Sequence, residues 1–170
     1  VLLGPGLNIK RSPLCGRNFE YFSEDPYLAG KMAASYVRGI QSQGIYACPK
    51  HFAVNSQELR RMAMNSVLDE RTLREIYLTG FEIAIKEGKA KSIMTSYNEV
   101  NGVYANENEH LLKEILREEW GFDGVLMSDW STTAPEDGSI PWKCIEAGND
   151  LIMPGSEKDD ADIRQAYADG

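Results

Sequence analysis

Side chains suited to binding and catalysis follow the ends of four apolar runs in this sequence. In chain order they are Arg17, Lys50, His51, Tyr97, Asn98, Asp129 and Trp130. Arginine, lysine and histidine can hydrogen-bond to vicinal hydroxyl groups, and an aromatic ring can cover the apolar face of a sugar. A carboxylate among them could attack an anomeric carbon or stabilise an oxocarbenium ion. The pattern therefore indicates a site for a hydroxyl-rich ligand, with Asp129 at its reactive centre.

Each of these residues also has a simpler interpretation when taken alone. Asp129 in "SDWST" could cap a following helix, and Trp130 could belong to the core. Lys50 and His51 could be solvated loop residues, and Arg17 could pair with Glu20 or Glu24 to order its loop. Four such coincidences at successive run ends are less probable than one convergent site. In that site we expect neighbouring cations to hold the pKa of Asp129 below its ordinary value.

The apolar runs themselves indicate buried parallel strands. They are "VLLGPGLNI" (1–9), "GIYACP" (44–49), "AKSIMTSY" (90–97), "GVLMSD" (124–129) and "DLIMPG" (150–155). Each is short and continuous rather than alternating, which is typical of a strand that is covered on both faces. In parallel α/β folds, ligands bind at the carboxyl ends of the strands, where the polar residues above are found.

Helical patterns separate these runs. Amphipathic helices are predicted over 24–44, 69–88 and 106–121, with shorter ones over 140–148 and 158–170. Asp69 can cap the second helix and Gly88 can end it, while Gly121 lies at the end of the third. The alternation predicts an α/β fold with a parallel sheet, either open and doubly wound or curled as a partial (β/α)8 TIM-type barrel of about five strands.

Composition excludes several classes of function. The 170 residues carry a net charge of -8, which argues against nucleic acid and anionic membranes as partners. Cys15, Cys48 and Cys144 are far apart and lack metal-ligand spacing, so neither a disulfide framework nor a metal site is expected, and no cofactor is predicted. No apolar run is long enough to span a membrane. The compartment stays undecided, because the sequence does not begin with methionine.

Several segments, in this order, resemble those of glycoside hydrolase family 3, which includes β-glucosidases, β-xylosidases and related exo-acting enzymes. They are "GRNFEYFSEDP" (16–26), "KHF" (50–52), "MTSYNEVNG" (94–102) and "GFDGVLMSDW" (121–130), with "AGNDLIMPG" (147–155) beyond them. The resemblance implies a retaining β-glycosidase that acts on terminal β-linked sugars through a covalent glycosyl-enzyme on Asp129. It implies that the residues binding or surrounding the sugar are Arg17, Lys50, His51, Arg61, Met94, Tyr97 and Trp130.

The sequence departs from the family pattern in two respects. It has no Asp-Gly-Pro motif, whose aspartate holds the sugar in the family, and the loop after "KHF" has no histidine, which resembles the β-glucosidase branch. In that branch a glutamate from a later domain is the general acid/base. We therefore expect residues 1–170 to be a fragment of a single N-terminal barrel domain, inactive when isolated and prone to self-association at its open sheet edges.

Two other interpretations remain open at the level of sequence. One is a non-catalytic carbohydrate-binding or assembly module derived from such an enzyme. The other is a lyase or aldolase barrel that uses Lys50 as a Schiff base, for which a lysine at a strand end is the only support.

Overall fold

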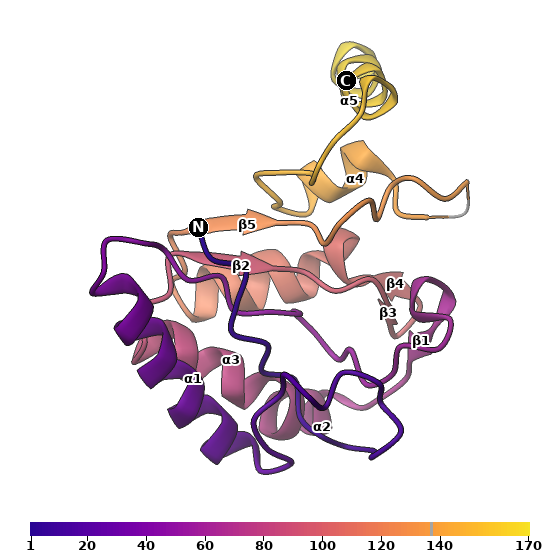
Figure 1. Ribbon diagram of the computed structural model, residues 1–170. Helices are drawn as coiled ribbons and strands as arrows, with labels where there is room; N and C mark the ends of the chain where they lie inside the picture. The colour runs from indigo at the N-terminus through magenta and orange to yellow at the C-terminus, as the bar shows by residue number, and fades with distance from the viewer. Residues whose placement is uncertain (137) are drawn as a thin grey trace.

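The five predicted strand segments lie side by side, and the helices pack around them (Figure 1). The computed structural model describes residues 1–136 and 138–170. The helices are α1 (Pro26–Gln41), η1 (Arg61–Ala63), α2 (Glu70–Thr72), η2 (Leu73–Leu78), α3 (Thr79–Lys86), η3 (Ala105–Glu107), η4 (His110–Glu119), α4 (Pro141–Glu146) and α5 (Glu157–Asp169). The strands are β1 (Asn65–Ser66), β2 (Ser92–Met94), β3 (Glu99–Val100), β4 (Val103–Tyr104) and β5 (Val125–Met127).

All five predicted runs are joined by parallel pairing in the order of the chain. The pairs are Leu2 with Ala47, Gly6 with Lys50, Phe52 with Thr95, the strands β2 with β5, and Met127 with Leu151. A doubly wound sheet would reverse its strand order at a switch point. Consecutive parallel order is instead the arrangement of a (β/α)8 barrel, so the structure is consistent with part of such a barrel and decides between the two predicted architectures.

Only two of the five predicted strands are regular over three residues. The runs at 1–9, 44–49 and 150–155 pair through isolated bridges, and each contains a proline: Pro5, Pro49 and Pro154 respectively. Proline lacks the backbone N–H group that a ladder needs, so it shortens the pairing. The sequence therefore predicted the positions and direction of these segments, but overestimated their regular length.

A small second sheet was not predicted. Strand β1 pairs in parallel with β3, and β3 turns back to pair antiparallel with β4. Asn101 and Gly102 at the turn have φ values of +52° and +87°. Positive φ at both central positions is typical of the tight hairpin turn that Asn-Gly favours. This hairpin follows Tyr97 directly, next to the loop that carries Arg61.

The predicted helices are confirmed, including three of their boundaries. Asp69 caps the second helix by accepting a hydrogen bond of 2.8 Å from Thr72 N–H, and α2, η2 and α3 continue without a break to Lys86. A Cβ atom at Gly88 would lie 2.3 Å from the Ala84 carbonyl oxygen, so the chain can leave the helix there only with glycine. Gly121 follows η4 with φ of +66°.

The core lies between the strands and the helices α1, α3 and η4. Phe52, Phe81, Ile93, Leu112 and Leu126 are all fully buried there. Helices α1 and α3 pack closely, because Gly30 and Gly80 face each other: a Cβ atom at Gly30 would lie 3.1 Å from the Gly80 Cα atom. By contrast, α5 stands off from the body and reaches it through α4 (Figure 1).

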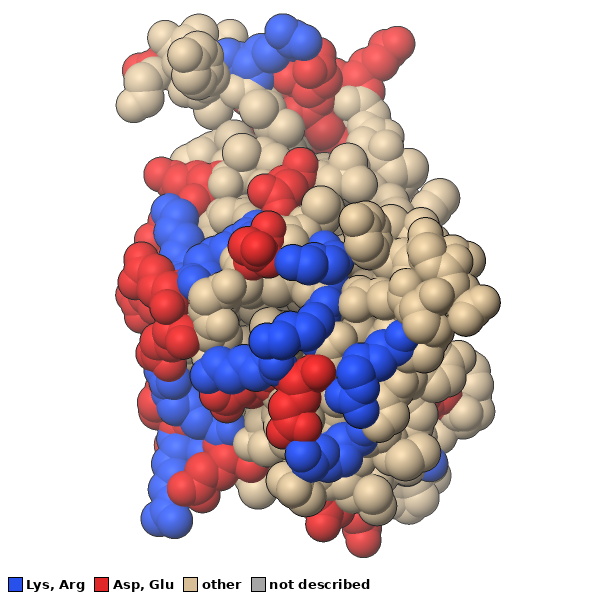
Figure 2. Space-filling model, turned by 90° about the vertical axis from the view of Figure 1, so that its left-hand side faces the viewer, with Lys and Arg blue, Asp and Glu red and all other residues tan. Residues whose placement is uncertain are grey.

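The surface carries charges of both signs. On the face drawn in Figure 2, Lys and Arg side chains are interspersed with Asp and Glu and do not form one basic field. Among the described residues, no helix has both the length and the apolar character needed to cross a membrane. The three cysteines are buried free thiols.

Isolated residues 1–170 should self-associate. Val1, Leu2 and Leu3 at one edge of the parallel strands are 40–68% exposed, and Leu151 at the other edge is 47% exposed. Exposed strand edges and apolar patches favour association. Light scattering should detect dimers or larger species, and Leu151→Lys should shift them toward monomer. A monodisperse 19.0 kDa monomer would contradict this expectation.

Candidate functional site

The Asp129 carboxylate is buried at the end of β5 and only half satisfied. Its side-chain oxygen Oδ1 accepts a 2.6 Å hydrogen bond from Trp130 N–H. Oδ2 has no hydrogen-bond partner within the described residues, although Asp129 is only 7% exposed. The next helix, α4, begins after Ile140. The helix-cap interpretation of Asp129 is therefore wrong, and the carboxylate has an oxygen available for another partner.

His51 faces this free oxygen. Its Nε2 atom lies 3.6 Å from Asp129 Oδ2, and its ring is buried. The backbone of His51 is fixed by the Asn8 amide, which accepts from His51 N–H at 2.7 Å and donates to the His51 carbonyl at 2.9 Å. Burial, as the largest cause, and the charges of Arg17, Lys50 and Arg61 together lower the pKa of His51 to about 2. His51 is therefore neutral, and its contact with Asp129 is not an ion pair.

The three cations are held by two carboxylates. Glu20 accepts from Arg17 Nε at 2.5 Å and lies 3.6 Å from Lys50 Nζ. Glu58 accepts from Arg61 Nη1 at 2.7 Å and lies 4.0 Å from Arg17 Nη1. This network links the loop after the first strand segment to the loop after the second. The predicted Arg17–Glu20 contact is confirmed, but it connects Arg17 to the rest of the cluster as well as ordering its own loop.

Tyr97 and Trp130 have different surroundings. The Arg61 guanidinium stacks on the Tyr97 ring, with 4.2 Å from Cζ to the ring centroid. The Tyr97 hydroxyl donates to the Trp130 carbonyl at 2.5 Å. Trp130 itself is 56% exposed, so its interpretation as a core residue is wrong. Since Arg61 covers one face of Tyr97, the exposed Trp130 ring is the better candidate for contact with a ligand.

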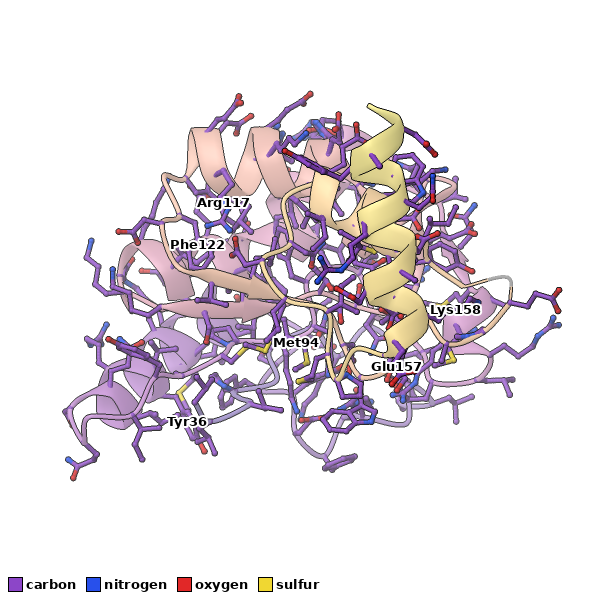
Figure 3. The ribbon with its side chains drawn as sticks, turned by 90° about the horizontal axis from the view of Figure 1, so that it is seen from above. Tyr36, Met94, Arg117, Phe122, Glu157 and Lys158 are labelled. Atoms are coloured by element: carbon purple, nitrogen blue, oxygen red, sulfur yellow. The ribbon has the colours of Figure 1, made fainter. Side chains whose placement is uncertain are left out.

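Met94 lies in an apolar cluster. It is 2% exposed and packs with Cys48, Met127 and the partly buried Met153 in a sulfur-rich cluster. Figure 3 shows Met94 near the middle of the molecule when viewed from above. Burial raises the pKa of the Cys48 thiol to about 11, and the nearby Asp129 charge contributes to this rise. The cluster therefore lies close to the carboxylate without supplying a polar contact to it.

The expected low pKa of Asp129 is wrong. Burial raises the pKa of Asp129 above its ordinary value of 3.8, while Trp130 N–H and the charges of Arg61, Arg17 and Lys50 oppose the rise. Desolvation disfavours a charged carboxylate, and here it outweighs the cations because their charges are shared with Glu20 and Glu58. The sequence indicated the cations and a possible Arg17–Glu20 pair, but not that Glu58 also pairs with cations of the cluster.

A separate cavity lies away from Asp129. A cavity of about 620 Å³ opens between the loop at Arg11–Cys15, the loop at Val54–Gln57 and the start of α2, and its lining residues do not include Asp129. Among residues 1–136 and 138–170, no group of three or more His, Cys, Asp or Glu side chains could hold a metal ion. The candidate site is thus the Asp129 cluster and its cations.

Four residues of this cluster were missing from the predicted binding set: Glu20, Tyr21, Asn55 and Glu58. Glu20 and Glu58 each lie three residues from an arginine of the cluster, and that spacing was visible in the sequence. Tyr21 and Asn55 gave no such signal, because their partners are distant in the chain. The Tyr21 hydroxyl contacts His51 Nδ1 across 30 positions and accepts from Asn55 across 34.

Comparison with known proteins shows the family of this chain. Residues 1–166 match the model of the "Glycosyl hydrolase family 3 N terminal domain". The chain belongs to glycosyl hydrolase family 3. Among its relatives in this family, it is 54% identical over 156 residues to "Thermostable beta-glucosidase B" of Acetivibrio thermocellus. It is also 49% identical over 170 residues to an "Exo-alpha-(1->6)-L-arabinopyranosidase" of Bifidobacterium longum.

Solved family 3 structures share the fold. β-Glucosidase 3B from Thermotoga neapolitana in complex with glycerol superimposes with a TM-score of 0.93 at 52% identity. The alignment covers 99% of this chain and 24% of that protein. The match to the Acetivibrio relative covers 92% of this chain and 20% of that relative. The match to the Bifidobacterium relative covers 100% of this chain and 22% of that relative. The family 3 chain therefore corresponds to about a fifth of the length of these relatives.

Replacing Asp129 by Asn should stabilise the full-length protein at neutral pH. A folded-state pKa above the unfolded value means that the stability given by the protonated carboxyl is present below the ordinary aspartate range and is lost as pH rises through the raised pKa. The uncharged amide does not undergo this loss. Thermal melts should give Asp129→Asn a higher Tm at neutral pH, with a difference that shrinks in acid.

Asp123→Asn is the matched control for this measurement. Asp123 is exposed and pairs with Lys91 at 3.2 Å, and that contact lowers the pKa of Asp123. Its replacement should therefore leave stability at neutral pH unchanged or slightly reduced. A lower Tm of Asp129→Asn at every pH would show that burial of the Asp129 charge does not dominate.

Proposed function

We propose that residues 1–170 form part of the N-terminal barrel domain of a retaining, exo-acting β-glycosidase of the β-glucosidase type. One observation carries the proposal: a buried carboxylate at a strand end has one oxygen without a hydrogen-bond partner in the described structure. Burying such a group is costly, so it is expected where a reaction uses it. The names of several family 3 relatives, which are β-glucosidases, agree with this function.

In the proposed reaction, Asp129 is the nucleophile. Its carboxylate oxygen forms a bond to the anomeric carbon while the bond from that carbon to the leaving oxygen breaks. A glutamate outside these residues gives its proton to the leaving oxygen, and the two carboxyl groups of a retaining pair are about 5 to 5.5 Å apart. The same glutamate then takes a proton from water, whose oxygen replaces Asp129 on the sugar. Two inversions restore the original configuration.

The surrounding residues would bind the glycone. The charges of Arg17, Lys50 and Arg61 act on Asp129, and the neutral His51 ring places Nε2 3.6 Å from Asp129 Oδ2. The exposed Trp130 ring can cover the apolar face of a pyranose. Binding these hydroxyls mainly in the distorted, oxocarbenium-like ring would lower the barrier rather than only the KM. A terminal β-linked glucoside or short oligosaccharide is the substrate class that we propose.

The β-glucosidase and α-L-arabinopyranosidase names among the relatives indicate which orientation of the leaving group the site would accept. β-Glucopyranosides and α-L-arabinopyranosides both carry an equatorial leaving group in their common chair form. A nucleophile placed as Asp129 would attack either from the opposite face. The carbohydrate-binding module and the Schiff-base aldolase find no comparable support, because the relatives reported above are named as glycosidases.

Asp129→Asn or Asp129→Ala should abolish turnover of aryl β-glucosides by the full-length enzyme. Loss of a nucleophile commonly lowers kcat by about 10⁴-fold or more. A 2-fluoro-glucoside should label Asp129 covalently in the parent enzyme, as mass spectrometry of peptides can show. Asp123→Asn serves again as the control with normal activity. Near-normal turnover by Asp129→Asn would remove Asp129 from the nucleophile role.

Lys50→Ala should weaken transition-state binding more than His51→Ala. Hydrogen bonds involving a charged group are worth about 1.5 to 3 kcal/mol, whereas neutral ones are worth about 0.5 to 1.5 kcal/mol. Since His51 is neutral, its loss should lower kcat/KM less than the roughly 10- to 150-fold expected for Lys50. Deoxy substrates identify the contacted hydroxyls, and Lys113→Ala, at an exposed surface pair, is the control. Equal losses for deoxy and parent sugars would show that these residues only hold their loop.

A further inference from the structure

We propose that Tyr21 and Asn55 are positioning residues that fix the tautomer of His51, so that its single ring proton is on Nε2 and faces Asp129. The proposal concerns the arrangement of hydrogen-bond donors around His51. Its consequence for catalysis rests on the glycosidase function proposed above, whereas the tautomer itself can be measured without any turnover.

The contacts of Asn55 determine the orientation of its side-chain amide. Its Nδ2 group donates to Glu58 Oε1 at 3.0 Å and to the Tyr21 hydroxyl at 3.2 Å. If the amide were turned over, its carbonyl oxygen would face the Glu58 carboxylate, and two acceptors would meet. Glu58 therefore requires the NH₂ group on this side. Asn55 is 1% exposed, so water cannot readily replace this contact.

The Asn55 donor determines what the Tyr21 hydroxyl can do. A phenol has one proton to donate, and its oxygen can accept. Since the oxygen accepts from Asn55, the proton is free to point to the other neighbour, His51 Nδ1, at 3.2 Å. Burial raises the pKa of Tyr21, so the phenol keeps that proton at neutral pH. Tyr21 is 3% exposed and holds this position inside the protein.

The acceptor role of Nδ1 then places the ring proton on Nε2. A neutral imidazole has one N–H group and one acceptor nitrogen. With Nδ1 accepting from Tyr21, Nε2–H faces Asp129 Oδ2, 3.6 Å away, which has no other partner among the described residues. The opposite tautomer would place two acceptors, the Nε2 lone pair and the carboxylate oxygen, against each other.

The hydrogen-bond chain from Glu58 through Asn55 and Tyr21 to His51, called the relay below, gives His51 a defined function in the site. A donor at Nε2 can bind a substrate hydroxyl beside the nucleophile and leaves the Asp129 lone pair free to react. Each residue of the relay sets the donor direction of the next. The Glu58 carboxylate, which also holds Arg61, therefore determines which His51 nitrogen is the donor. Tyr21 does not contact the reacting atoms in this scheme and acts only through His51.

A double-mutant cycle on the full-length enzyme tests the relay. Tyr21→Phe retains the buried ring, and it should lower kcat/KM about 5- to 10-fold, as expected for one neutral hydrogen bond. In a His51→Gln background the same change should cost less than about 2-fold, because a glutamine amide can donate from the Nε2 position and has no tautomer to select. Tyr36→Phe, at a half-exposed tyrosine, is the control.

Neutron diffraction of the deuterated protein locates the deuterium on the His51 ring, and this measurement does not depend on activity. We expect deuterium on His51 Nε2 in the parent protein and on Nδ1, or on both nitrogens in part, in Tyr21→Phe. Deuterium on Nδ1 in the parent would overturn the proposal, and so would an equal loss from Tyr21→Phe in both His51 backgrounds. If the parent protein hydrolyses no glycoside but carries deuterium on Nε2, the function fails while the tautomer assignment stands.

Discussion

The burial of one carboxylate constrains the rest of this structure. Asp129 is taken out of water at the end of β5, and one of its oxygens has no partner among the described residues. An ionised carboxylate in such a place is destabilising unless positive charge lies nearby. Arg17, Lys50 and Arg61 provide that charge, but they also need counter-ions of their own. Glu20 and Glu58 supply these, and the resulting balance leaves the pKa of Asp129 raised rather than lowered.

The fold brings these charged side chains together because consecutive parallel segments end at the same edge of the sheet. Each of the first four segments leads to a part of the cluster, and the three segments that contain proline pair only through isolated bridges. Close packing keeps the loops in place. At Gly6, paired with Lys50, a Cβ atom would lie 3.0 Å from Glu20 Oε2, so a larger residue there would displace the carboxylate that joins Arg17 and Lys50. The charge network and the backbone are therefore interdependent.

Two kinds of hydrogen-bond donor surround Asp129. The charged donors Arg17, Lys50 and Arg61 are fixed by carboxylates, whereas His51 is neutral and fixed by a phenol and an amide. In the proposed reaction, a neutral donor would stabilise the Asp129 charge less than a further cation would, so it could orient a hydroxyl and weaken the attack less. Trp130, which is exposed, provides apolar area at the rim. Such a division suits a sugar, which has both hydroxyl edges and apolar ring faces.

The sequence by itself determined the segment order, the helices with the Asp69 cap, and the clustering of Arg17, Lys50, His51 and Asp129 at segment ends. These follow from short-range patterns: apolar runs, helical periodicity and polar residues directly after a run. The tertiary structure alone decided that the segments pair consecutively, that Asn101–Gly102 closes a hairpin, and that burial raises the pKa of Asp129. It alone brought Tyr21 and Asn55 to His51. Desolvation and long-range hydrogen bonds depend on which distant residues surround a group, and sequence spacing does not contain that information.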